Sequence, residues 1–128
     1  MNPHLVKWCC EQGLPVSLMG LDVLSFLDAS FDGVVLDNVL EHLETPNLLL
    51  KEIHRVLVSG GKLIIGVPGC RGYAYDPDHK VFYDEESLVK SLTRAGFIKE
   101  KIFHMPIHSA WLEKRLRQYS IYGVFNRS

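Results

Sequence analysis

Residues 31–69 read FDGVVLDNVLEHLETPNLLLKEIHRVLVSGGKLIIGVPG, and this stretch decides the fold. Residues 31–36 and 62–67 are short apolar runs of the kind that form strands covered on both faces in a parallel sheet. Between them, a segment that starts near Pro46 and ends at Gly60 places apolar residues at helical spacing. The pattern predicts two adjacent parallel strands joined by a helix in a right-handed crossover.

The rest of the chain predicts further elements on either side of this unit. Upstream, Asn2-Pro3 favours a helix start and Gly13 its end, with a buried stripe of Leu5, Val6 and Cys9. Downstream, Asp84 is expected to cap a helix that ends near Gly96. The other expected elements are strands at 15–19, 97–104 and 119–125, a short helix within 111–117, and loops at 21–30 and 69–80.

Two of these expectations concern orientation. The last two strands are separated by too few residues for a parallel return through a full helix, so we expect them to pair antiparallel. In the central helix, the core face is expected to comprise Leu49, Leu50, Ile53, Val56 and Leu57. The residues expected to face away from the core are Lys51, Glu52 and Arg55.

Composition places the chain among ordinary globular proteins and argues against several partners. The 128 residues are 47% hydrophobic and 23% charged, with a formal net charge of −1. Because there is no basic block, we expect no nucleic-acid partner, and the apolar runs are too short to cross a membrane. No signal peptide is expected. Three cysteines without CxxC spacing predict reduced thiols and a cytoplasmic location.

Four short sequence motifs, in this order along the chain, make it resemble a known family. They are Ser30-Phe31-Asp32, Leu40-Glu41-His42-Leu43, EIHRVL at residues 52–57, and Gly60-Gly61. At these spacings the chain is similar to the class I S-adenosylmethionine-dependent methyltransferases, in particular the type 11-like methyltransferase domain. The resemblance implies an α/β fold with a three-layer, Rossmann-like sheet that is mostly parallel and has an antiparallel last strand.

The resemblance also implies an N-terminally truncated domain. The family's glycine-rich turn after its first strand, and the acidic residue that binds the ribose after its second, have no counterpart in this sequence. We therefore expect a single partial domain over residues 1–128, roughly the C-terminal two thirds of a family domain, without its first two strands. In the family strand order 3-2-1-4-5-7-6, strand 4 would then be an uncovered apolar edge, so either strand 3 moves over to pair with it, or another copy of the chain covers it, or the fold is loose.

The family's cofactor, S-adenosylmethionine, implies binding residues after two strands. Gly20, Asp22 and Val23 follow the expected third strand, where family members contact the adenine. Asp37 and Asn38 follow the fourth, where the family lines the methionine part of the cofactor. From the residues alone, these aspartates serve equally well as turn or cap residues. Without the glycine-rich turn, the chain alone is expected to bind the cofactor weakly or not at all.

Histidine and tyrosine residues are the candidates on the substrate side. His42 is a candidate general base near neutral pH, although a structural role is the commoner one. By resemblance, the residues that would cover or line a substrate pocket are Tyr73, Tyr75, His79 and Tyr83, with core packing as the alternative. Asp76, Asp78 and His79 match no metal-binding loop, so a solvated loop and no metal site are expected.

The expected function is transfer of a methyl group from S-adenosylmethionine to a small-molecule acceptor that the sequence does not identify. The alternative is a non-catalytic methyltransferase-like remnant, or an interaction module, that has lost cofactor binding. A nicotinamide-binding Rossmann domain is a third interpretation, but it would not predict the closing antiparallel strands.

Overall fold

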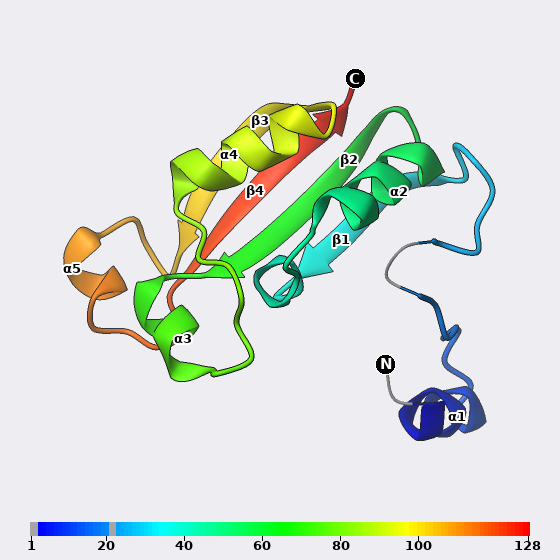
Figure 1. Ribbon diagram of the computed structural model, residues 1–128, viewed down its shortest axis with the longest axis horizontal. Helices are drawn as coiled ribbons and strands as arrows, with labels where there is room; N and C mark the ends of the chain where they lie inside the picture. The colour runs from blue at the N-terminus through cyan, green and yellow to red at the C-terminus, as the bar shows by residue number, and fades with distance from the viewer. Residues whose placement is uncertain (1–2, 21–22) are drawn as a thin grey trace.

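The computed structural model describes residues 3–20 and 23–128, which build a four-stranded sheet in the order β1-β2-β4-β3 (Figure 1). The strands are β1 (Phe31–Asp37), β2 (Leu57–Pro68), β3 (Phe97–Met105) and β4 (Ser120–Arg127). The helices are α1 (Pro3–Glu11), α2 (Asn47–Val56), α3 (Cys70–Tyr75), α4 (Glu85–Arg94) and α5 (Ala110–Glu113), with a 3-10 turn η1 (Leu40–His42). Within these ranges no helix is long and apolar enough to cross a membrane.

The central unit of the sheet is the predicted parallel pair. β1 and β2 run parallel, with Val34 opposite Leu63 and Leu36 opposite Ile65, and α2 lies between them in the sequence. The strands are apolar enough to be buried, and the helical stripe between them supplies a cover for one face. The predicted parallel pair and the helix between its strands are therefore confirmed, but α2 ends at Val56, and Leu57 to Gly61, expected in the helix and its terminating turn, begin β2.

The second half of the sheet is antiparallel. β4 is inserted between β2 and β3, so that Ile121 lies opposite Val67 on one side and His104 on the other. Taking β1 and β2 as family strands 4 and 5, the observed order reproduces the 4-5-7-6 part of the family sheet. The predicted antiparallel closing pair and the α/β fold class are confirmed.

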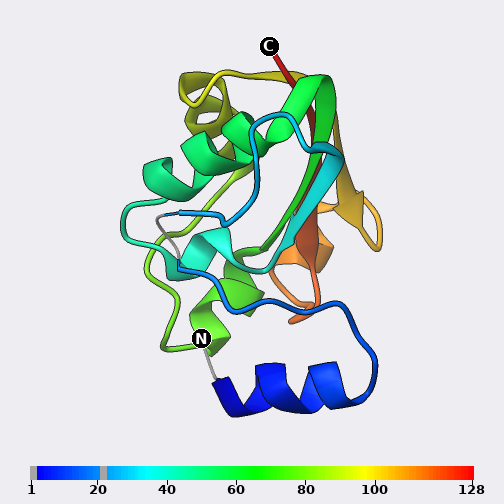
Figure 2. The ribbon, with the colours of Figure 1, turned by 90° about the vertical axis from the view of Figure 1, so that its right-hand side faces the viewer.

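The core lies between the sheet and the helices α2 and α4, which cover the same face (Figure 2). Alternate β2 residues Leu63, Ile65 and Val67 point into it and are fully buried, as the two-residue period of a strand requires. The helices contribute Leu49, Leu50, Ile53, Leu88 and Leu92. Truncating one such leucine to alanine typically costs about 2–5 kcal/mol, so this face supplies much of the stability.

The opposite face of the sheet carries exposed apolar side chains. Val35 is 68% exposed, Ile98 59% and Ile64 37%, because neither α2 nor α4 lies on that side. β1 is thus covered on one face, and the prediction that its apolar run is covered on both is wrong for the described chain. It is also an edge strand, as expected from the missing family strands.

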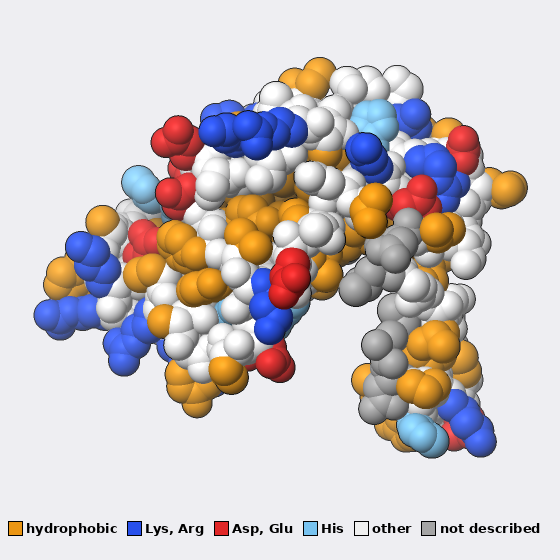
Figure 3. Space-filling view, in the orientation of Figure 1, with side chains coloured by type: hydrophobic (Ala, Val, Ile, Leu, Met, Phe, Trp, Pro, Cys, Tyr) orange, Lys and Arg blue, Asp and Glu red, His pale blue; other side chains and the backbone are white. Residues whose placement is uncertain are grey.

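The N-terminal segment does not join the sheet. The predicted strand at 15–19 is wrong, because these residues belong to none of the four strands that the described chain forms. α1 stands apart from the sheet, and its apolar side chains form a separate surface (Figure 3). Leu5 is 58% exposed, and α1 has no buried residue. The predicted stripe of Leu5, Val6 and Cys9 is therefore not buried, because α1 lies away from the core.

Two other local predictions need correction. The loop expected at 69–80 contains the helix α3, which begins directly after Gly69. The short helix expected within 111–117 is α5, which ends already at Glu113. The predicted cap of α4 is confirmed: Asp84 accepts the Ser87 N–H at 2.8 Å, and the Ser87 hydroxyl accepts the Asp84 N–H at 3.0 Å.

Glu52 and Arg55 on α2 do not face solvent as predicted. Glu52 accepts the Leu24 N–H at 2.9 Å, and Arg55 donates to the Leu24 carbonyl at 2.9 Å, so the pair holds the segment that leads into β1. The guanidinium also binds both Glu52 oxygens, and this hydrogen bonding, with that from Leu24, lowers the pKa of Glu52 to about 2. Helical spacing correctly predicts that Glu52 and Arg55 lie outside the apolar stripe of α2. It carries no information about the loop around Leu24, which packs over them.

Candidate functional site

The carboxyl ends of β1 and β2 meet at one end of the sheet, where open α/β folds bind ligands. Asp37 is the last residue of β1, and Asn38 follows it with a φ of 51°. Asparagine tolerates this left-handed conformation better than most residues. Here it lets the Asn38 N–H donate to the Gly66 carbonyl at 3.0 Å while its side-chain amide donates to Asp37 Oδ1 at 3.2 Å.

Because Gly66 on β2 has no side chain, Asp37 and Tyr122 of β4 can approach each other above it. A Cβ at Gly66 would overlap Asp37 Oδ1 and lie only 2.5 Å from Tyr122 Cε1. The Tyr122 ring stacks on Phe103, with centroids 5.5 Å apart. Burial, together with the charge of Asp37 and a hydrogen bond to it, raises the pKa of Tyr122. The phenol is therefore a fixed, protonated donor beside the strand ends.

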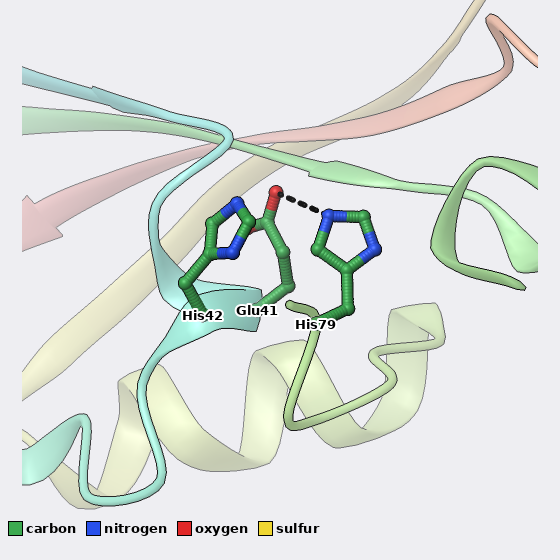
Figure 4. A group of neighbouring side chains, drawn as sticks. All are labelled: Glu41, His42 and His79. Carbon is green, nitrogen blue, oxygen red and sulfur yellow. Dashed lines mark ion pairs between the residues drawn. The ribbon is translucent and has the colours of Figure 1, made fainter. Parts of the chain in front are cut away.

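A second group of residues lies next to these strand ends. η1 and the loop after α3 bring Glu41, His42 and His79 together, with their ligand atoms within 4.8 Å of one another (Figure 4). Glu41 is 1% exposed, and neither of its carboxylate oxygens has a hydrogen-bond partner. His79 Nε2 approaches Glu41 Oε1 at 3.9 Å. Burial raises the pKa of Glu41, although its own backbone and the neighbouring imidazoles partly oppose this.

The backbone explains why these residues meet. The Glu41 carbonyl accepts the N–H groups of Lys80 and Val81 at 2.7 and 3.1 Å, which fixes the loop against η1. Because His79 directly precedes Lys80, this docking also fixes the position of His79 next to Glu41. The contact joins residues 38 positions apart, so spacing in the sequence could not predict it.

A cavity of about 420 Å³ opens beside both groups and is lined largely by polar residues. Asn38, His79 and Tyr122 line it from the strand ends and the loop after α3. Arg117 and Tyr75 line another part, and the Arg117 guanidinium lies 3.6 Å from the centre of the Tyr75 ring. The cavity therefore offers hydrogen-bond donors and a positive charge to a bound molecule.

The residues predicted to lie on the substrate side do not share one environment. Tyr75 and His79 line the cavity, and Tyr73 stacks on His79 with ring centroids 5.4 Å apart. Tyr83 is only 4% exposed and lies in the core, where burial and the charge of Glu41 raise its pKa. His42 Nδ1 lies 3.3 Å from the Asp78 carbonyl, which orients its ring.

Of the predicted adenine-side residues, Gly20 and Val23 lie within the described chain, and neither lines this cavity. Gly20 is exposed and borders an apolar groove of about 370 Å³ along β1 and α2. Val23 is 64% exposed, and Asp22 lies outside the described residues. Asp37 and Asn38 are thus the predicted cofactor residues that the structure brings to the strand ends.

Sequence reasoning missed three residues of the site. Tyr122 lies in a predicted strand and Arg117 in a segment expected to be helical, and neither was a candidate site residue. Glu41 was noticed only as part of the sequence motif Leu40-Glu41-His42-Leu43, on which the family resemblance rests. No signal in the sequence singles out Glu41, because its burial between Leu40 and the loop that holds His79 is seen only in the structure.

Comparison with known proteins agrees with this geometry. Residues 3–65 match the model of a family described as a methyltransferase domain. The chain is 34% identical over 101 residues to an uncharacterised protein of Methanocaldococcus jannaschii, covering 79% of this chain and 47% of that protein. It is also 34% identical over 101 residues to a tRNA U34 carboxymethyltransferase of Desulfotalea psychrophila, covering 70% and 32%. The chain thus spans about half, or less, of these relatives' length.

Among solved structures, a Thermotoga maritima S-adenosylmethionine-dependent methyltransferase, described as a possible histamine N-methyltransferase, has the same fold. The TM-score is 0.75 at 19% identity, covering 98% of this chain and 70% of that one. This likeness concerns the fold, which is that of S-adenosylmethionine-dependent methyltransferases. The match of residues 3–65 to the methyltransferase-domain model confirms the resemblance seen in the sequence, and the fold of the described residues agrees with it.

The residues present fit one side of the family's cofactor. Asp37 and Asn38 offer a carboxylate and an amide at the end of β1. The ten glycines of the sequence include no glycine-rich turn of the family type, so no backbone cradle for the cofactor's charged end is provided by this chain. The fit of these residues to the cofactor is therefore incomplete.

Proposed function

We propose that this chain forms the acceptor-facing part of a methyltransferase that transfers a methyl group from S-adenosylmethionine to a small molecule. The polar cavity at the carboxyl ends of β1 and β2 carries the proposal, since this is where a class I fold binds its ligands. The cofactor supplies a methyl group on a positively charged sulfur, which is already activated. Positioning of the acceptor is then the main task left to the protein.

The chain's residues suit that task. Asp37 and Asn38 would hold the cofactor from the side of β1, and the Tyr122 phenol would donate a hydrogen bond near the same point. Arg117 favours an acceptor that carries a negative group. Lysine and arginine side chains gather near α5 at this end of the molecule (Figure 3), including Lys114 and Arg115.

A small acceptor is proposed although one relative is named for a tRNA substrate. The net charge of −1 gives no general attraction to a polyanion, and basic side chains lie at several places on the visible face of the molecule, not in one continuous patch (Figure 3). The non-catalytic alternative keeps one supporting observation, the absence of the glycine-rich turn from this sequence.

Titration of the isotope-labelled chain with S-adenosylhomocysteine, followed by NMR, tests the proposal because it detects millimolar binding. We expect the amides of Asp37, Asn38 and Gly66 to shift, with a dissociation constant above about 1 mM. Each lost charged hydrogen bond typically costs about 1.5–3 kcal/mol, and the cofactor's charged end and ribose lack theirs.

Asp37→Asn should weaken these shifts, whereas Asp32→Asn, at the amino end of the same strand, serves as the matched control. Shifts confined to other regions, or equal shifts with NADH, would argue against the proposal. Saturable binding below about 10 μM would contradict the claim that the site in this chain is incomplete.

A further inference from the structure

Glu41, His42 and His79 form a cluster whose chemistry the proposed function does not use. Glu41 comes from the turn η1 and is 1% exposed, yet both of its carboxylate oxygens lack a hydrogen-bond partner. A buried carboxylate without partners is costly, because it has lost its water without gaining a donor. Such a group is expected to meet a cation, and the imidazoles beside it are metal ligands.

The two imidazoles are oriented for such a cation. His79 Nδ1 lies 2.8 Å from the Tyr73 carbonyl, and His42 Nδ1 lies 3.3 Å from the Asp78 carbonyl. A carbonyl can only accept, so each Nδ1 carries the proton and each Nε2 keeps a lone pair. Backbone carbonyls hold metal-binding histidines in this way in known sites. In Figure 4 the two rings flank the Glu41 carboxylate.

We propose that Glu41, His42 and His79 bind a divalent transition-metal ion such as Zn²⁺ or Co²⁺ through Glu41 and the Nε2 atoms of both histidines. Tetrahedral ligands at about 2.1 Å from a metal lie about 3.4 Å apart. The His79 Nε2–Glu41 Oε1 distance of 3.9 Å would therefore shorten by about half an ångström on binding, a shift that side-chain rotation supplies.

Two nitrogens and one carboxylate oxygen favour a borderline metal over Mg²⁺, which prefers oxygen ligands and strict octahedral geometry. Three protein ligands leave a coordination position open. His79 also lines the 420 Å³ cavity, so that position lies beside the proposed acceptor site. A role in orienting the acceptor rests on the proposed function, whereas metal binding itself does not.

The cluster is not the group of Asp76, Asp78 and His79 that lie close together in the sequence. The Asp78 backbone carbonyl holds His42, and Asp76 Oδ2 lies 3.9 Å from His79 Nε2 as a further neighbour. Asp76 is the more exposed of the two carboxylates near His79, with 44% of its side chain accessible against 1% for Glu41.

The test is titration of the chelator-treated chain with Co²⁺, followed by visible absorbance, and with Zn²⁺ by calorimetry. We expect one ion per chain, with at least tenfold weaker binding in Glu41→Gln and at least a hundredfold in His79→Gln. His108→Asn removes an exposed imidazole near β3 and should bind as the unaltered chain does. Mg²⁺ at the same concentrations should not compete.

Because a variant of buried Glu41 could misfold, the unaltered chain provides a second measurement. Bound Co²⁺ is paramagnetic and should give the imidazole signals of His42 and His79 large contact shifts, far larger than any shift of the His54 or His108 signals. Absence of binding at millimolar Zn²⁺, or undiminished binding by folded His79→Gln, would overturn the proposal and leave a simple His79–Glu41 ion pair. Cofactor titration by NMR is independent of this result, so the two proposals fail separately.

Discussion

Replacing Gly66 by alanine tests whether the strand-end site depends on the space above β2. The new Cβ would overlap Asp37 Oδ1 and lie 2.5 Å from Tyr122 Cε1, about 1 Å closer than carbon atoms normally approach. Asp37 is exposed and can rotate away, but Tyr122 is held by its stack on Phe103. Overpacking of this kind typically costs about 1–3 kcal/mol. We expect a loss in that range by urea unfolding.

Gly33→Ala is the matched control, because Gly33 lies in the neighbouring strand and its added Cβ would meet nothing closer than 3.6 Å. Its effect should stay within about 1 kcal/mol of zero, since alanine is tolerated in a strand at least as well as glycine. Ultraviolet titration gives a second readout: when Asp37 turns away, the pKa of Tyr122 should fall towards its ordinary value. Equal stabilities for the two variants, with an unchanged tyrosine titration, would refute the reasoning.

Two further predictions concern the elements that hold the site. Because the folded pKa of Glu52 is about 2, below its ordinary 4.5, its stabilising contribution is present above pH 4.5 and is lost as the pH falls from there to 2. In Glu52→Gln the melting temperature should therefore start lower and fall less over that window, while Glu86→Gln, on the surface of α4, keeps the original slope. Asp84→Ala removes the cap of α4 and should lower the free energy of unfolding by about 1 kcal/mol, whereas Asp84→Ser should recover most of it; equal losses for both would contradict the capping role.

The fold could be predicted because its signals are local and repeated. The apolar runs at 31–36 and 62–67 and the helical stripe between them depend only on neighbouring residues, and each became the expected element. Residues 15–19 show the limit of such signals. Their composition allows a strand, but a strand needs a partner, and none of the described strands provides one.

The candidate site was less predictable because it is built from distant segments. Asp37 and Asn38 follow directly from the end of a recognised strand, and His42 lies within a family word. In contrast, Tyr122 reaches Asp37 only through the β2–β4 register, and His79 reaches Glu41 only through the backbone docking of its loop. Propensities and spacing carry no information about such contacts, whereas the unpartnered burial of Glu41 becomes visible only in three dimensions.

The exposed edge and face of the sheet bear on two properties: whether the chain self-associates, and how its incomplete cofactor site could be completed. β1 is an apolar edge strand, its Val35 is 68% exposed, and an apolar groove of about 370 Å³ runs along it. This side of the sheet is therefore expected to be covered by another polypeptide segment. A second copy of the chain could cover the edge, but it would bring no glycine-rich turn, because no position in the sequence carries one. Strands from a segment that contains such a turn would cover the same edge and complete the cofactor site.

A self-associated chain with only millimolar affinity for S-adenosylhomocysteine therefore indicates that a second copy of the chain covers the edge. Tight binding that appears only when a second polypeptide is added indicates that a segment with such a turn covers it.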